Sequence, residues 1–127
     1  MLIDGWNLKD IILECKEFLD QNSGGIIVEG KRDADALEFL KIPKEFILVK
    51  SGLSLFDLVD QIKRKGYKQV IILFDFDSEG KKLYLSLKQE LQIYRDIKVN
   101  NKIRRDFYRL VRSKGVTEIE DIISIDF

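Results

Sequence analysis

Two aspartates that stand two residues apart, Asp75 and Asp77, are the part of this sequence best suited to chemistry. In extended backbone, residues two apart point to the same side, so both carboxylates would face one point while Phe76 faces the core. Carboxylates held close together repel each other unless a cation lies between them. Oxygen ligands of this kind suit Mg²⁺ or Mn²⁺, which also bind phosphates. The pair predicts a divalent-metal site; the alternative is that Asp77 only caps the next helix and Asp75 is a solvated strand end.

A second group of polar residues follows the first apolar run of the chain. Glu29 comes directly after Ile26-Ile27-Val28, where an unpaired charge is costly. Gly30 removes a side chain where the backbone turns into a helix, which would let a phosphate approach backbone N–H groups. Lys31 either balances phosphate charge or is simply solvated, and we interpret Asp33 as a helix cap.

The elements that must position these residues alternate along the chain. Continuous apolar runs at 26–28, 46–49 and 70–74 predict strands buried on both faces, and a weaker strand is expected at 97–99. Apolar residues at helical spacing predict helices at 7–20, 33–40, 55–65 and 80–91, and two basic helices within 101–123. Alternating strands and helices indicate an α/β fold with a parallel sheet covered on both sides.

The predicted sheet brings the candidate residues together at one edge. Ligands of open parallel sheets bind beyond the carboxyl ends of the strands, where the strand order switches. We therefore expect the first strand to lie beside the third, with Glu29, Asp75 and Asp77 converging at that edge.

Composition removes several classes of function. The chain has 127 residues, which fits one domain, residues 1–127. It contains no histidine and a single cysteine, Cys15, so histidine-based catalysis, histidine-liganded zinc and a disulfide framework are excluded. Lys+Arg and Asp+Glu each number 22, so the net charge is zero and the overall charge does not indicate nucleic-acid binding. No membrane span or signal peptide is expected, and we predict a soluble, cytoplasmic protein.

One stretch near the C-terminus is strongly basic. Between residues 98 and 114 seven basic residues stand against one acid, Asp106. On a helix, Arg105, Arg109 and Arg112 share an outer face, opposite an apolar stripe. Such a face could neutralise phosphates and bind nucleic acid, DNA or RNA; the alternative is a solvated face with no ligand.

Together these motifs resemble the Toprim domain, which topoisomerases, bacterial-type primases and several nucleases share. The resemblance rests on Glu29-Gly30-x-x-Asp33 after one strand and Asp75-x-Asp77-x-x-Gly80 after a later one, and covers about residues 24–99. It implies a Toprim-like (Rossmann-like) three-layer sandwich with a four-stranded, mainly parallel sheet flanked by helices.

The resemblance also implies roles for single residues. Glu29 matches the family's general acid or base, and Asp75 and Asp77 match its Mg²⁺-binding pair, with Glu29 close enough to share the ion. Gly30 and Gly80 match turn glycines, and Gly52 resembles the small-residue turn after the middle strand. Many members have proline where this chain has Phe76.

Several functions fit this pattern. The chain lacks the extra regions of topoisomerases and primases and a Walker loop, so we expect a standalone Toprim core with small additions at both ends. The leading hypothesis is a Mg²⁺- or Mn²⁺-dependent nuclease. The alternatives are a non-catalytic module that binds RNA, DNA or a protein complex, and a haloacid-dehalogenase-like phosphatase, whose Asp-x-Asp pair normally ends the first strand.

Overall fold

A computed structural model describes residues 8–21, 24–42, 46–49, 54–94, 96–113 and 115 of the chain. Helices and strands alternate through this part of the chain, as predicted. In chain order they are α1 (Leu8–Gln21), β1 (Gly24–Val28), α2 (Lys31–Phe39), β2 (Phe46–Leu48), α3 (Leu55–Arg64), β3 (Gln69–Leu73), α4 (Ser78–Gln92), β4 (Lys98–Val99) and α5 (Asn101–Ser113).

The strands form one sheet in the order β2-β1-β3-β4, and every pairing is parallel. The first strand lies beside the third, which confirms the predicted neighbours. The register aligns Val28 with Leu73 at the carboxyl ends of β1 and β3. The last strand is short: β4 pairs with β3 only at Gln69 and Val70, so among the described residues no strand lies beside the far half of β3 on that side.

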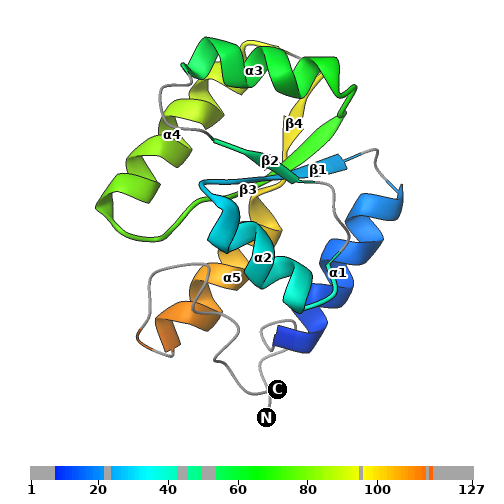
Figure 1. The fold of residues 1–127 in the computed structure, drawn as a ribbon, viewed down its shortest axis with the longest axis vertical. Helices are drawn as coiled ribbons and strands as arrows, with labels where there is room; N and C mark the ends of the chain where they lie inside the picture. Colours follow the sequence, from blue (N-terminus) through cyan, green and yellow to red (C-terminus); the bar gives the residue numbers. More distant parts are fainter. Residues whose placement is uncertain are drawn as a thin grey trace.

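Helices cover both faces of the sheet, which gives three layers (Figure 1). Ile26, Val28 and other alternate residues of the central strands pack against α1, α2 and α5 on one face. Ile27 and Ile72 point the other way and pack against α3 and α4. Because successive side chains of a strand face opposite sides, strands covered twice must be apolar throughout, as β1 and β3 are.

Local signals set several helix ends. The Ser54 hydroxyl accepts a hydrogen bond from the Asp57 N–H at 3.1 Å and is the N-cap of α3. Gly66 follows that helix at φ +75°, a left-handed conformation that glycine adopts without strain. Two helices begin two residues before their predicted starts at 33 and 80: α2 begins at Lys31 and α4 at Ser78.

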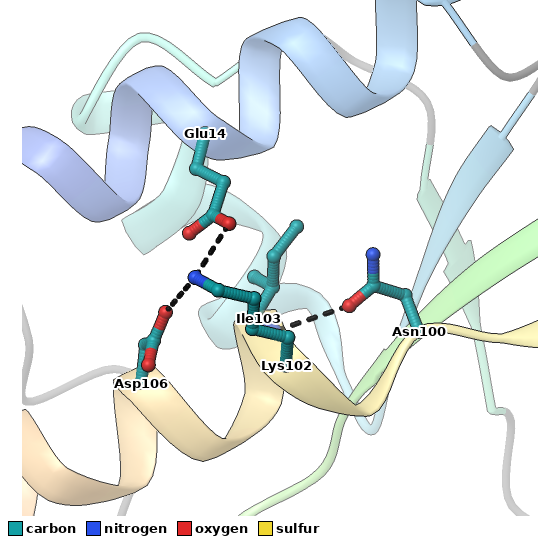
Figure 2. A network of polar contacts seen from close by, with 5 residues as sticks. All are labelled: Glu14, Asn100, Lys102, Ile103 and Asp106. Carbon is teal, nitrogen blue, oxygen red and sulfur yellow. Dashed lines mark hydrogen bonds and ion pairs between the residues drawn. The ribbon is translucent and has the colours of Figure 1, made fainter. Parts of the chain in front are cut away.

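A three-residue polar network joins α1 to α5 (Figure 2). The Lys102 Nζ donates to Glu14 Oε2 at 2.7 Å and to Asp106 Oδ2 at 3.0 Å. These two carboxylates raise the pKa of Lys102. At the start of α5 the Asn100 side chain accepts from the Ile103 N–H at 3.1 Å, an N-cap that fixes where the helix begins.

Cys15 lies on the buried face of α1. Burial, with smaller contributions from Glu14 and Asp106, raises the pKa of its thiol to about 12. A thiol this protonated is a core side chain rather than a nucleophile.

Some predicted features lie outside the described residues: Gly52, residue 7 of the first helix, and the final helix up to residue 123. The described part of the basic region is α5, which ends at Ser113. Within the described segments, no helix has the length and apolar character needed to cross a membrane.

Candidate active site

Glu29 and Asp75 meet at the carboxyl edge of the sheet. Because β1 and β3 are neighbours in register, the residues that follow them emerge side by side. The backbone N–H of Asp75 donates a hydrogen bond to Glu29 Oε1 at 2.7 Å, across 46 residues of sequence. The two predicted motifs are therefore in contact at this edge.

Glu29 is half-buried, and its surroundings favour the protonated carboxyl. Burial is the largest cause that raises its pKa, and the nearby charges of Asp75, Asp77 and Glu79 raise it further. The hydrogen bond from the Asp75 N–H acts in the opposite direction but does not cancel these effects. The repulsion between carboxylates that the sequence predicts thus contributes to the raised pKa of Glu29, but burial contributes more. A carboxyl of this kind can exchange a proton closer to neutral pH than an ordinary glutamate.

Asp77 is the N-cap of α4. Its Oδ1 accepts a hydrogen bond from the Gly80 N–H at 2.8 Å, and the side chain is exposed. The capping role weighed for Asp77 in the sequence is thus what the structure describes. It leaves the second carboxylate oxygen and further lone pairs for another ligand.

Gly80 lies against the end of β3 in the first turn of α4. A Cβ added there would collide with the carbonyl group of Asp75. Only glycine lets the helix start this close to the strand end, so Gly80 keeps the Asp75–Asp77 turn tight.

The turn after β1 is arranged differently from the expectation. Gly30 is the N-cap of α2, and its N–H donates to Asp33 Oδ2 at 3.2 Å, so this donor already has a partner. Among the described residues, its two chain neighbours apart, no heavy atom lies within 4 Å of the position of a Cβ on Gly30, so this part of the structure leaves the space above it open. Lys31 is exposed and pairs with Asp35 at 3.3 Å.

Arg104, one of the seven basic residues between positions 98 and 114, is a buried charge. It is only 6% exposed. Its Nη1 donates to the carbonyl oxygens of Ile72 at 3.1 Å and Phe74 at 2.8 Å. The guanidinium lies 4.1 Å from the ring centroid of Tyr84 and 4.6 Å from that of Phe76.

The charge of Arg104 also acts on the candidate site. Burial lowers its pKa to about 10, while attraction to Tyr84, Glu29 and Asp75 opposes that shift, so it is charged at neutral pH. The burial of Arg104 could have been predicted from its spacing. It precedes buried Phe107 by three residues and buried Val111 by seven, which places it beside the apolar stripe of α5.

The outer face of α5 agrees in part with the expectation. Arg105, Arg109 and Arg112 are all exposed, and the predicted apolar stripe of the helix is buried. The surface is less basic than the count of residues suggested, because Arg104 is buried and Lys102 is paired with two carboxylates.

The residues at the sheet edge carry oxygen donors of the kind that divalent cations prefer. Within the described ranges, no group of three or more carboxylate or thiol side chains is arranged to hold a metal ion. The donors that are present suit Mg²⁺, which is commonly bound by one or two carboxylates, water and substrate phosphate. Asp75 and Asp77 fit this pattern, with Glu29 adjacent.

A family model, the Toprim domain, matches residues 25–111 of the chain, from β1 into α5. The chain belongs to the Toprim domain family. Domains of this family typically bind divalent metal ions, and the family connects the chain with nucleic-acid-related proteins. The match includes most of α5, beyond the range of about 24–99 expected from the motifs.

Relatives resemble the chain over nearly its whole length. A UPF0292 protein of Methanocaldococcus jannaschii is 36% identical over 117 residues, which cover 92% of this chain and 88% of the relative. A UPF0292 protein of Pyrococcus furiosus is 38% identical over 115 residues, 91% of this chain and 80% of the relative. The solved structure of a putative protein from Aquifex aeolicus has a TM-score of 0.70 at 30% identity and covers 91% of this chain and 97% of that one.

Proposed function

We propose that this protein is a Mg²⁺- or Mn²⁺-dependent nuclease that hydrolyses nucleic-acid phosphodiesters. The observation that carries the proposal is the hydrogen bond of 2.7 Å between the Asp75 N–H and Glu29 Oε1. It joins the two motifs of the family at the sheet edge where parallel sheets bind their ligands. The family match over residues 25–111 supports the same kind of function.

Asp75 and Asp77 are the residues that would hold the metal ion, with the second oxygen of Glu29 as a further donor. A bound divalent ion would polarise a phosphate oxygen and neutralise developing charge. The raised pKa of Glu29, to which the charges of both aspartates contribute, supports this assignment, because carboxylates in such a group favour a cation.

We assign proton transfer to Glu29. A general acid or base works best when its pKa lies near the working pH, and the raised pKa of Glu29 lies closer to neutral pH than that of an ordinary glutamate. As a base it would take a proton from the attacking water, and as an acid it would give one to the leaving oxygen. Its hydrogen bond to the backbone of Asp75 fixes the carboxyl beside the aspartates.

The nucleic acid would be held by positive charge from two helices. Arg105, Arg109 and Arg112 of α5 are exposed and can neutralise phosphates. At the start of α2 the open space above Gly30 admits a phosphate close to the backbone, and Lys31 can exchange its surface partner Asp35 for that phosphate.

A specific observation favours a second candidate, a non-catalytic module that binds nucleic acid or a protein complex. Asp77 already caps α4 and the Gly30 N–H already has a partner, so two of the family's positions also serve local structure. The phosphatase alternative loses support, because the aspartate pair follows β3 and the family model is Toprim. Our proposal treats residues 1–127 as a single domain that acts in the cytoplasm.

A cleavage panel tests the nuclease. Single- and double-stranded DNA and RNA are incubated with wild type and with Glu29→Gln, in Mg²⁺, Mn²⁺ or chelator. We expect metal-dependent cleavage of at least one substrate by wild type and none by the variant. Binding without cleavage under every condition would support the non-catalytic module, and equal cleavage by Glu29→Gln would show that the activity does not come from this site.

A further inference from the structure

A groove of about 530 Å³ runs between α4 and α5, next to the candidate active site. Its size is in the range of roughly 300–1,000 Å³ that ligand pockets occupy. Each helix contributes residues three, four and seven apart, so one continuous face of each helix lines the groove. The side chains used below are Lys81, Tyr84 and Lys88 from α4 and Arg104, Arg105 and Tyr108 from α5; we call this the α4–α5 groove.

The groove exists because the sheet ends early on this side. The two helices cover opposite faces of the sheet (Figure 1), and a longer β4 would fill the space between them. However, β4 pairs with β3 only at Gln69 and Val70. Beyond these residues the guanidinium of Arg104 takes the place of a strand and binds the carbonyls of Ile72 and Phe74.

The walls of the groove combine positive charge with aromatic rings. Of the nine described residues that line the groove, four are Lys or Arg and none is Asp or Glu. Three others are aromatic: Phe76, Tyr84 and Tyr108. Basic grooves with aromatic side chains bind single-stranded nucleic acid, because the cations follow the phosphates and the rings stack on unpaired bases.

The two tyrosines are placed differently. One face of the Tyr84 ring carries the Arg104 guanidinium at 4.1 Å, and its hydroxyl donates to Asn101 Oδ1 at 2.6 Å, so Tyr84 is held in place. The Tyr108 ring packs against Phe76 with centroids 5.4 Å apart. Its other neighbour is the exposed Lys81, whose Nζ lies 5.6 Å from the ring centroid. A phosphate can draw this flexible side chain aside, which makes Tyr108 the ring best suited to stack on a base.

The groove reaches the carboxylates through Phe76. This residue stands between Asp75 and Asp77 in the chain, and its ring contacts both Tyr108 and the Arg104 guanidinium. A strand bound in the groove would therefore arrive at the carboxyl end of β3.

From these observations we infer that the α4–α5 groove binds a single-stranded segment of nucleic acid and leads it to the Glu29–Asp75–Asp77 edge. The inference rests on the proposed function and adds the form of the substrate. A duplex keeps its bases stacked on one another and offers no free base face to Tyr108, so it would use the cations alone.

Binding is measured by fluorescence anisotropy in chelator, so that cleavage cannot interfere, with labelled dT12 and U12 and a hairpin duplex. Lys81→Gln/Lys88→Gln removes two groove cations. We expect its salt dependence on dT12 to fall by about 1.4 log-log units, at about 0.7 per phosphate on single strands. This corresponds to about 25-fold weaker binding at 0.1 M salt if both proteins bind equally at 1 M. Lys82→Gln, on the same helix and exposed but outside the groove, is the matched control and should bind within twofold of wild type.

Stacking is tested separately at Tyr108. Tyr108→Leu should weaken dT12 binding by about 5- to 150-fold with an unchanged salt slope, and Tyr108→Phe should restore it. An abasic dodecamer carries the same charge without bases, so wild type and Tyr108→Leu should bind it equally. A purely structural defect would weaken both oligonucleotides together and would count against the inference.

Other results would overturn the inference. Wild type that does not bind dT12 or U12 in low salt contradicts it, as does wild-type affinity in the groove variants combined with loss in Arg109→Gln/Arg112→Gln. The latter result would show that nucleic acid binds outside the groove and would favour a protein as the ligand of the groove.

The outcome is separable from that of the proposed nuclease. Glu29→Gln should bind like wild type in chelator. Groove-dependent binding without any cleavage would refute the nuclease and keep the inference. Cleavage of single strands by the groove variants at the wild-type rate would do the reverse.

Discussion

The Asp75 N–H donates to Glu29 Oε1 over 2.7 Å, although 46 residues separate the two in sequence. The contact is made by backbone on one side and side chain on the other. Replacement of the Asp75 side chain therefore leaves the donor in place, and replacement of Glu29 by glutamine leaves an acceptor in place. The charges at this edge can be changed one at a time without loss of the bond that organises it.

Glu29→Gln should stabilise the protein at neutral pH. The folded state raises the pKa of Glu29, chiefly by burial, so the native state binds this proton more tightly than the unfolded chain. Its stabilising effect is complete below the unfolded pKa, about 4.3, and is lost as pH rises through the folded pKa. We therefore expect the Tm of Glu29→Gln to exceed that of wild type at pH 7–8 and to converge with it near pH 4. A Tm difference that is independent of pH would contradict the assignment.

Metal together with oligonucleotide should stabilise wild type more than the aspartate variants. A ligand at a hundredfold excess over Kd adds about 2.7 kcal/mol, which for a domain of this size is a Tm rise on the order of 10 °C. Asp75→Asn and Asp77→Asn should each lose most of this rise. Asparagine is as good an N-cap as aspartate, so Asp77→Asn keeps the start of α4. Asp60→Asn, on the exposed pair with Arg64, is the control and should respond like wild type.

Gly80→Ala should destabilise the protein, although the helix propensity of alanine is about 1 kcal/mol more favourable than that of glycine. The new methyl group would collide with the Asp75 carbonyl, and overpacking of this kind costs about 1–3 kcal/mol. Urea unfolding of Gly30→Ala gives the comparison, because its added methyl group meets no atom of the described residues within 4 Å, chain neighbours apart. Equal stability of the two variants would show that the turn can relax.

Arg104→Met should cost about 2–6 kcal/mol of unfolding free energy. Methionine can replace the apolar stem of arginine but has no donor, so the carbonyls of Ile72 and Phe74 would lose their partner, at about 1–3 kcal/mol each. The exposed neighbour should tolerate change, with Arg105→Gln within about 0.5 kcal/mol of wild type in the same urea titration. If Arg104→Met is as stable as wild type, water must satisfy the two carbonyls.

Removal of the three arginines on the outer face of α5 should weaken duplex binding and flatten its salt dependence. The expected loss is about 0.9 log-log slope units for each phosphate contact removed. The Arg105→Ala/Arg109→Ala/Arg112→Ala variant should fold, because the buried stripe of the helix is untouched. An unchanged slope in an anisotropy titration would assign this face to solvent.

Much of the fold could be predicted from the apolar pattern alone. Continuous runs such as Ile26–Val28 are typical of strands covered twice, and the parallel sheet with β1 beside β3 follows from the alternation of elements. Together with the two motifs, this was enough to place Glu29 next to Asp75.

The partners of polar groups at the site could not be predicted in the same way. Whether the Gly30 N–H is open to a phosphate or bound to Asp33 depends on a rotamer, not on a residue type. A count of charges alone could not predict the burial of Arg104, because it does not reveal that β4 ends after two residues and leaves carbonyls for a guanidinium to bind. The α4–α5 groove is a consequence of the same short strand.

The position of Arg104 also bears on how copies of this protein behave toward each other. An unpaired strand edge offers backbone acceptors to any extended segment, and sheets left open in this way tend to grow by joining sheets of other molecules. At the edge of β3, the Arg104 guanidinium occupies the backbone acceptors of Ile72 and Phe74. It cannot itself form the backbone hydrogen bonds that a second strand would need. We therefore expect the guanidinium to disfavour pairing with a strand of another molecule at this edge of β3.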